Sequence, residues 1–506
     1  MFFSVYSLGC KLNQLENEAI ADSFRREGYT FIPWGMTEAP AAAGSLPSGP
    51  GSDECGIFVI NTCTVTSMAE QKARRVIRKT LREQPGACLI VTGCYAQMEK
   101  AGLEALENEL SDDEESFDKA AGDFCVPGRL FVVPGSLKNC LLDLPAFLSK
   151  AGDVPNCSVL SGLIAAWLDS PGLREQPLSR DGSFRFRPEK FSSHSRGFLK
   201  VQDGCDRRCA YCRVSLARGK SRSLGAEEAL KELRSLEERG FAEVVITGVN
   251  ISQYRDLSGS GAPLGLAALL DYLLEGTEKI RLRLSSIEPD GLTDDLMHVL
   301  ENRRIRPHFH LSLQSGSAGI LSKMGRTYTP DHIEKALMRL RSVREDPFLA
   351  CDIIAGFPGE TEEEFEITFS LCERAGFAWI HAFPFSRRPG TAAYDFPAKV
   401  SERDAVKRVE LLTELARKGR QDYIERWKGK EVEAIVEAGK KPGKGFVPGV
   451  SENYLKLLIA CGEEPVPSPG SLIRCRVSQN PEVLRNFGIV GSRFDAHAEK
   501  TESIGE

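Results

Sequence analysis

Three closely spaced cysteines are the residues of this chain best suited to carry chemistry. Cys205, Cys209 and Cys212, called here the first cysteine set, stand in QDGCDRRCAYC with the spacing C-x3-C-x2-C. Three thiolates at this spacing bind three irons of a four-iron, four-sulfur cluster and leave the fourth iron open to a substrate or cosubstrate. A partial zinc knuckle is the alternative, but zinc ribbons usually use paired C-x2-C units. The spacing therefore predicts an open-sided iron–sulfur cluster.

A second group of cysteines follows three predicted β-strands near the N-terminus. The segments FFSVYSLGC, CGIFVINTC and ACLIVTGC end at Cys10, Cys63 and Cys94, called here the second cysteine set. Parallel strands that alternate with helices place their carboxyl ends at one edge of a sheet. We therefore expect these cysteines to converge on a second open-sided cluster. Cysteines also fill protein cores, and that interpretation suits the rest of the fifteen.

Composition and length indicate a multidomain globular protein. The chain has 506 residues, of which 42% are hydrophobic and 27% charged, so two to four domains are expected. No apolar run has the length needed to span a bilayer, and the first residues lack the features of a signal peptide. Many cysteines without a secretion signal favour a reducing compartment. We expect a cytoplasmic protein that has no membrane partner.

The elements that must position the cysteines predict an α/β fold. Alternating strands and helices over residues 1–145 predict an open α/β domain, and residues 146–192 look like a linker. Six βα-type units over residues 193–422 predict a partial parallel (β/α)6 barrel, with chemistry at the carboxyl ends of its strands. Short strands over residues 423–495 predict a small β-barrel. Residues 496–506 are expected to be a disordered tail.

Charge is distributed unevenly although the net charge is only −6. A basic helix, QKARRVIRKTLR, is predicted over Gln71–Arg82, and an acidic segment follows Glu104. The acidic segment and the loop Ala39–Ser52 are interpreted as surface insertions. A basic helix is either an RNA-binding surface or a solvated face.

These motifs carry a resemblance that covers nearly the whole chain. CDRRCAYC after a strand, followed by ITGVN, SSIEP, LSLQSGS and DIIAGFPGET, resembles the radical S-adenosylmethionine superfamily. SLGCKLNQ, INTCTVT and TGCYAQ resemble the N-terminal domain of the methylthiotransferases, and the C-terminal barrel resembles a TRAM domain, an RNA-binding module. RLRLSSIEPDGL, PHFHLSLQSGS and HAFPFSRRPGTAA are similar to the branch that acts on threonylcarbamoyladenosine in tRNA. As a departure, Ser215 and Leu216 stand where relatives commonly have a proline and an aromatic residue.

The resemblance implies a role for each motif. The first cysteine set would hold the cluster that binds and reductively cleaves S-adenosylmethionine, and the second set would hold an auxiliary cluster that handles the sulfur. Tyr211 is expected near the adenine, or else as a packing aromatic. Arg326 is expected to contact a carboxylate or the substrate, or to form an exposed salt bridge. Residues after successive strands, each otherwise an ordinary turn residue, are expected to complete the pocket: Thr247, Gly248, Asn250, Ser285, Ser286, Glu288, Gln314, Ser315, Gly356, Pro358 and Gly359.

The implied function is methylthiolation of tRNA. An enzyme of this kind inserts a methylthio group at carbon 2 of N6-threonylcarbamoyladenosine next to the anticodon, with two [4Fe-4S] clusters and S-adenosylmethionine as cofactors. The alternatives are the same reaction on N6-isopentenyladenosine, methylthiolation of a ribosomal protein aspartate, and a non-catalytic iron–sulfur sensor that binds RNA. The expected partners are a tRNA anticodon stem-loop and an electron donor of the flavodoxin or ferredoxin type. RNA contacts are expected from the basic helix and from Tyr454 and Lys456 of the small barrel.

Overall fold

The computed structural model describes residues 1–34, 55–113, 128–152, 154–170, 182–191, 194–257, 263–438, 445–462, 466–478 and 494–504. The chain divides into two compact units. Unit 1 comprises residues 1–192 and 212–220, and unit 2 comprises residues 193–211 and 221–506. This division passes through the loop of the first cysteine set, because Cys212 belongs to unit 1 and the other two cysteines belong to unit 2.

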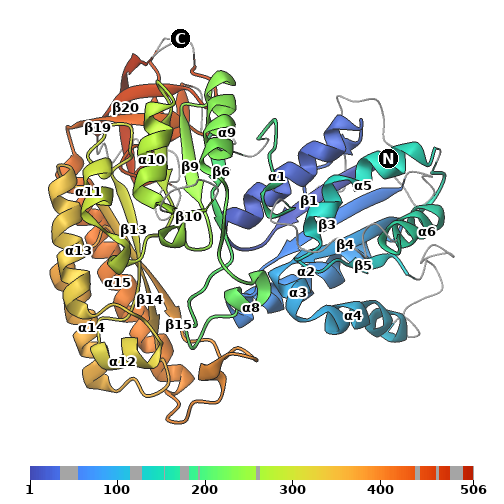
Figure 1. Cartoon of the computed structure of the whole chain (residues 1–506), viewed down its shortest axis with the longest axis horizontal. Coiled ribbons are helices and arrows are strands. Elements are labelled where there is room, and N and C mark those ends of the chain that lie inside the picture. The colour runs from blue at the N-terminus through green and yellow to red at the C-terminus, as the bar shows by residue number, and fades with distance from the viewer. Residues whose placement is uncertain are drawn as a thin grey trace. The chain divides into compact units, whose positions relative to one another are not determined.

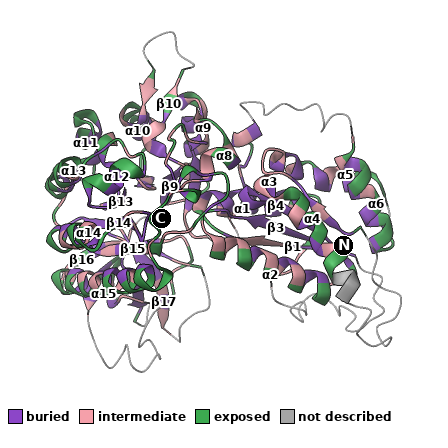
Figure 2. Cartoon of the chain, turned by 90° about the horizontal axis from the view of Figure 1, so that it is seen from below, coloured by how far each residue is buried: buried purple, intermediate pink, exposed green. Residues whose placement is uncertain are grey.

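Unit 1 is built on a parallel sheet with the strand order β2-β1-β3-β4-β5 (Figure 1). Its strands are β1 (Phe2–Ser7), β2 (Thr30–Phe31), β3 (Gly56–Thr62), β4 (Ala87–Gly93) and β5 (Leu130–Val132). The central strands β3 and β4 are buried along their whole length (Figure 2), as in sheets covered on both faces. Because β1, β3 and β4 run parallel, their carboxyl ends lie at the same edge of the sheet.

Helices connect these strands, and the sequence explains where α2 begins and which of its faces is buried. The first four are α1 (Lys11–Arg26), α2 (Ser67–Glu83), α3 (Cys94–Met98) and α4 (Lys100–Asp113). Thr66 caps α2 by accepting a hydrogen bond from the N–H of Ala69 at 3.1 Å, a common start signal for helices. Ala73, Ile77 and Leu81 recur at helical spacing and are buried, so the opposite, basic face of α2 points to solvent.

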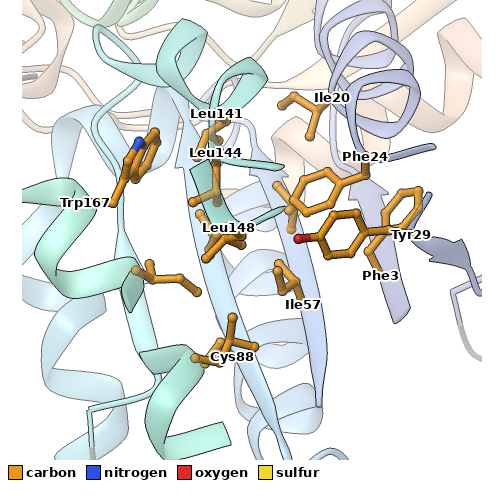
Figure 3. Packing of buried hydrophobic residues seen from close by; sticks show 14 of the residues in the cluster. Phe3, Ile20, Phe24, Tyr29, Ile57, Cys88, Leu141, Leu144, Leu148 and Trp167 are labelled. Carbon is orange, nitrogen blue, oxygen red and sulfur yellow. The ribbon is translucent and has the colours of Figure 1, made fainter. Parts of the chain in front are cut away.

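The segment 146–192, expected to be a linker, instead contributes to the core of unit 1. It contains most of α5 (Leu144–Lys150) and all of α6 (Cys157–Leu168). Leu144, Leu148 and Trp167 join one buried cluster with residues of the sheet, as Figure 3 shows around Ile57 and Cys88. The sequence pattern did not reveal this packing because α5 has only 7 residues, and because α6 is apolar on most of its surface rather than along one stripe.

Unit 2 contains a partial barrel of six parallel strands, as predicted. These are β6 (Gly197–Lys200), β9 (Glu243–Thr247), β12 (Arg281–Leu284), β13 (His308–Gln314), β14 (Phe348–Ala355) and β15 (Trp379–Pro384). They pair as β12-β9-β6 and β13-β14-β15, and isolated parallel bridges at Leu282 and Ile287 join the two halves. Helices lie outside the strands (Figure 1): α9 (Ala226–Glu238), α10 (Leu266–Glu275), α11 (Asp294–Leu300), α12 (Ala318–Lys323), α13 (Pro330–Val343), α14 (Glu362–Ala375) and α15 (Glu402–Trp427).

A small closed barrel follows in unit 2, with the strand order β16-β17-β18-β20-β19. Its strands are β16 (Glu431–Val436), β17 (Phe446–Ser451), β18 (Lys456–Ala460), β19 (Leu472–Ser478) and β20 (Ala496–Ser503). The expectation of a disordered tail after residue 495 is therefore wrong. β20 pairs with β18 and with β19, and Ala496 and Ala498 are fully buried. Its polar side chains resemble a solvated tail, but small alanines alternate with them and fill the barrel interior.

Buried charges join the two barrels within unit 2. Glu243 of β9 accepts hydrogen bonds from Arg283 at 2.6 and 3.1 Å and from Arg306 at 2.9 Å. Arg306 also donates to Glu433 of β16 at 2.8 Å. Burial alone would raise the pKa of Glu243, but Arg283 and Arg306 outweigh it and lower the pKa to about 2. Glu243 is therefore a carboxylate at neutral pH.

Some sequence expectations fall outside the described residues. The loop 39–52 lies outside them, as does the acidic segment after α4 from residue 114. The first part of that acidic segment belongs to α4. Within the described part of the chain, no helix combines the length and apolarity that a membrane crossing requires.

Candidate metal centres

The second cysteine set lies at the carboxyl edge of the unit 1 sheet, as predicted. Cys10 is the N-cap of α1, Cys63 follows β3 directly, and Cys94 is the first residue of α3. A thiolate is stabilised at a helix N-terminus by the partial positive charge of the free N–H groups. The long helix α1 therefore favours the metal-binding form of Cys10.

The three thiols of this set influence one another electrostatically. Burial, reinforced by Cys10 and Cys94, raises the pKa of Cys63 to about 12. Because a thiolate raises the cost of ionising a neighbouring thiol, a cation that compensates the charge favours the thiolate form of Cys63.

Backbone geometry brings the loops of Cys10 and Cys63 into contact. Gly9 has φ of +105°, and a Cβ atom placed on it would lie 2.6 Å from the Cys63 sulfur. Only glycine fits this position. Asn13 ties the same two loops together, because its Nδ2 donates to the carbonyls of Leu8 at 2.7 Å and Thr62 at 3.1 Å.

This donor set fits an iron–sulfur cluster with three protein ligands. Three thiols, which are the ligands that such clusters use, occupy one sheet edge. Among the described residues, no three His, Cys, Asp or Glu side chains surround a position for a single metal ion.

Each thiol of the first cysteine set lies beside an N–H donor. Arg326 Nη1 lies 3.2 Å from the Cys209 sulfur, and the Val214 N–H lies 3.4 Å from the Cys212 sulfur. Burial raises the pKa of Cys205, while hydrogen bonds from the Arg207 backbone and the Asn250 side chain oppose that rise. N–H groups of this kind tune the clusters that cysteine thiolates hold, and both Cys205 and Cys209 of unit 2 have one.

Arg326 is buried rather than part of an exposed salt bridge. Its side chain is 6% exposed, and Nη2 lies 2.9 Å from Glu288 Oε1. Glu288 also accepts hydrogen bonds from Arg207 at 3.0 and 2.9 Å. Two arginines thus occupy the carboxylate of Glu288, one of the residues that were expected to complete the pocket. The role of Glu288 that the structure describes is to orient Arg326 and Arg207.

Gln202, which sequence reasoning missed, organises the loop after β9. A Cβ atom on Gly248 would lie 2.8 Å from Gln202 Oε1, so glycine is required there. Gln202 accepts a hydrogen bond from the Asn250 N–H at 2.9 Å and donates to the Gly204 carbonyl at 2.7 Å. It therefore connects the predicted pocket residues Gly248 and Asn250 to the loop of Cys205.

The other predicted pocket residues differ in what they contact. Gln314 ends β13 with φ of +68°, a strained backbone that is often found at functional sites. Tyr211 packs beside a small apolar cluster that contains Phe357. Ser315 is fully buried and hydrogen-bonds Thr368 at 3.1 Å, so its role is structural. The remaining ones lie at or just after the ends of β9, β12 and β14: Thr247, Ser285, Ser286, Gly356, Pro358 and Gly359.

His310 and Asp352, which form a polar group with the predicted residue Ser286, were also missed. Ser286 Oγ lies 2.6 Å from His310 Nδ1, and His310 Nε2 lies 3.3 Å from Asp352 Oδ1. One side chain follows a strand and the other two lie on neighbouring strands. His310 and Asp352 are half-buried. No local spacing in the sequence links them, because Ser286 follows β12 while His310 lies in β13 and Asp352 in β14.

The residues expected to contact RNA lie on α2 and in the small barrel. The basic face of α2 lines a hollow of about 560 Å³. Tyr454, whose contact with RNA stays a prediction, packs on the partial barrel with its ring centroid 4.1 Å from that of His308 and 5.2 Å from Arg283. It is therefore part of the junction between the two barrels. Lys456 is exposed.

Comparison with known proteins agrees with this geometry. Residues 199–372 match the Radical SAM superfamily, and residues 45–112 match a family described as Uncharacterized protein family UPF0004. The chain is 38% identical to threonylcarbamoyladenosine tRNA methylthiotransferase MtaB of Treponema pallidum, over 95% of this chain and 99% of that protein.

Two further relatives show to which branch of the family the chain is more similar. The enzyme of the same name from Thermotoga maritima is 32% identical over 89% of this chain and 90% of that protein. The tRNA-2-methylthio-N(6)-dimethylallyladenosine synthase of Opitutus terrae is 28% identical over 94% of each. The chain belongs to the radical S-adenosylmethionine methylthiotransferase family, within its threonylcarbamoyladenosine tRNA branch.

Proposed function

We propose that this enzyme inserts a methylthio group at carbon 2 of N6-threonylcarbamoyladenosine next to the anticodon of tRNA. The observation that carries the proposal is the pairing of two cysteine sets. Cys10, Cys63 and Cys94 share one sheet edge in unit 1, and Cys205 and Cys209 lie in the loop after the first strand of the partial barrel. Enzymes of this family use two four-iron clusters and S-adenosylmethionine.

The cofactors and the chain divide the work. When bound, the two clusters and S-adenosylmethionine supply the one-electron and sulfur-transfer chemistry that side chains lack and that an unactivated C–H bond requires. The side chains hold these groups in place. Asn250 supports Cys205, Arg326 donates to Cys209, and the backbone of Val214 donates to Cys212. The strand ends that carry Gly248, Gln314 and Gly356 line the proposed cosubstrate pocket.

The tRNA is proposed to contact α2 of unit 1 and the small barrel of unit 2. α2 presents Arg74, Arg75, Arg78, Lys79 and Arg82 around one hollow, and phosphate contacts supply much of the affinity for nucleic acid. An adenosine in the anticodon loop must be unstacked to reach a catalytic pocket. The electron donor is proposed to be of the flavodoxin or ferredoxin type.

The substrate is tested by nucleoside mass spectrometry of tRNA. The reconstituted enzyme, with S-adenosylmethionine and reductant, is given anticodon stem-loops that carry threonylcarbamoyladenosine or isopentenyladenosine. We expect a 2-methylthio product on the first substrate only. If only the stem-loop with isopentenyladenosine gives a product, the enzyme has the substrate of the dimethylallyladenosine branch instead. Activity on neither RNA, together with modification of a ribosomal protein aspartate, would contradict a tRNA substrate.

The division between the two cysteine sets is tested with Cys63→Ala. This variant should still cleave S-adenosylmethionine but should form no methylthio product, because it lacks a ligand of the second set. Cys209→Ala is the matched control and should lose both activities. If Cys63→Ala also loses S-adenosylmethionine cleavage while its first cluster is intact by iron assay, the two sets do not have separate roles. A non-catalytic sensor would cleave no S-adenosylmethionine in any form.

A further inference from the structure

A buried arginine lies against the second cysteine set. Arg218 is the last residue of α8 (Val214–Arg218), which begins two residues after Cys212 in the part of the chain that belongs to unit 1. Its side chain is 7% exposed, and its Nε donates to the Cys94 sulfur at 3.3 Å. The arginine is 124 residues away from that cysteine in the sequence. No motif connects the two residues.

The rest of the guanidinium is held by acceptors on α1. Nη1 donates to Glu16 Oε1 at 3.1 Å, and Nη2 donates to Asn13 Oδ1 at 2.9 Å. Glu16 is fully buried and also pairs with Lys138 at 2.5 Å. Because the guanidinium is a rigid planar fork, two acceptors on one side fix the direction of the Nε–H bond on the other. The contact with Cys94 is thus a directed one.

The start of the same segment is anchored as firmly. Arg213 is 3% exposed and pairs with Glu70 at 3.1 Å and with Glu99 at 3.2 Å. The single helical turn α8 is therefore fixed to unit 1 at both ends. Cys212, a proposed ligand of the first cluster, immediately precedes Arg213 in the sequence.

We propose that Arg218 is a positioning residue for the auxiliary cluster and raises its reduction potential through the N–H···S hydrogen bond to Cys94. A cluster held by three thiolates is anionic and gains a further negative charge on reduction. A nearby cation and a hydrogen bond to sulfur stabilise the more negative, reduced state. This inference rests on the proposed function, because it assumes that the second cysteine set holds a cluster.

A role limited to folding is the competing explanation. If Arg218 served only to balance the charge of buried Glu16, its replacement would lower stability and iron content but would not change the potential of those clusters that still form. The potential of the assembled cluster is therefore the measurement that separates the two roles.

The test uses the full chain with the three cysteines of the first set replaced by alanine, so that only the auxiliary cluster remains. After anaerobic reconstitution, dithionite titration followed by electron paramagnetic resonance gives the midpoint potential for the uptake of one electron per cluster. We expect Arg218→Gln to shift the reduction equilibrium at least tenfold toward the oxidised state, which is about 59 mV for a one-electron couple. Arg218→Lys keeps the charge but loses the directed Nε–H, so a smaller shift in the same direction is expected.

Arg213→Gln is the matched control, because Arg213 is equally buried at the other end of the same turn but pairs with carboxylates. Its midpoint potential should equal that of the parent. If Arg218→Gln leaves the potential unchanged, or if Arg213→Gln shifts it equally, the proposal is wrong. If Arg218→Gln binds no iron, the midpoint potential of Arg218→Lys is used instead, and an unchanged potential in that variant means that the proposal is wrong. If the parent protein does not bind about four irons per chain, the second cysteine set holds no cluster. That result would contradict the proposed function rather than the role of Arg218.

Discussion

At the scale of single residues, the thiols are surrounded by side chains that no motif contains. Asn13, Glu16 and Arg218 converge around the second cysteine set, although Arg218 follows Glu16 by 202 residues in the chain. Gln202 plays a similar part near Cys205. The cysteines themselves were predictable from spacing and from their positions after strands. Their supporting residues were not, because contacts between segments far apart in sequence leave no local pattern.

Gly248 provides a first residue-scale prediction. Gly248→Ala would place a methyl group 2.8 Å from Gln202 Oε1 and 2.9 Å from its Cβ, so Gln202 must move and the Cys205 loop with it. At a cost of about 1–3 kcal/mol, S-adenosylmethionine should bind about ten- to hundredfold more weakly, as measured by equilibrium dialysis of the reconstituted protein. Gly265→Ala, where a Cβ atom meets nothing within 4 Å, should bind normally. Equal affinity in the two variants would contradict the role of Gly248.

Glu243 provides a second residue-scale prediction. Glu243→Ala leaves buried Arg283 and Arg306 without their shared carboxylate, which should destabilise unit 2 by about 3–5 kcal/mol in urea unfolding. Because the folded pKa of about 2 lies below the unfolded value, this contribution is complete at neutral pH and is lost only as pH falls toward 2. Glu414→Ala removes an exposed partner of Arg417 and should cost less than about 1 kcal/mol. Similar costs for both would contradict the importance of the buried group.

At the scale of elements, periodicity predicted the central strands and the six-stranded partial barrel but missed α5, α6 and β20. Long buried strands such as β3 and β4 carry an unbroken apolar run, so they are readable from the sequence. α6 carries no polar stripe, and β20 reads AHAEKTES, which has two small alanines and otherwise polar side chains. Such segments acquire their structure from their neighbours, Cys88 and Ile57 for α5 and α6, and β18 and β19 for β20.

The exposed face of α2 gives the element-scale prediction. Arg75→Glu combined with Arg78→Glu should weaken tRNA binding and lower the slope of log affinity against log salt by about 1.4, because each lost phosphate contact on a single strand removes about 0.7. Fluorescence anisotropy of a labelled anticodon stem-loop at several salt concentrations measures both. Arg403→Glu with Lys407→Glu makes the same charge change beside a hollow of about 630 Å³ at α15 and should change neither. An unaltered slope in the α2 variant would make α2 a solvated face only.

At the scale of the whole molecule, the two cysteine sets lead to a stoichiometry. Anaerobically reconstituted enzyme should contain about eight irons per chain, and replacement of either complete set by alanine should leave about four. An iron assay with acid-labile sulfide measures both quantities, and zinc is measured in parallel. An active protein that contains zinc and no iron would contradict both centres. Replacing core cysteines Cys88 and Cys157 by alanine is the control and should leave the iron content unchanged.

The position of β20 in the small barrel has a consequence for biosynthesis. β20 is the last described strand along the chain, yet it lies between β18 and β19 and pairs with both. Domains generally fold in order as the ribosome produces them, but this barrel has no closed form until its final strand has been synthesised. Until that moment β18 and β19 each present an unpaired edge, which is open to pairing with other chains. The nascent protein is therefore vulnerable to aggregation at these two edges until β20 has closed the barrel.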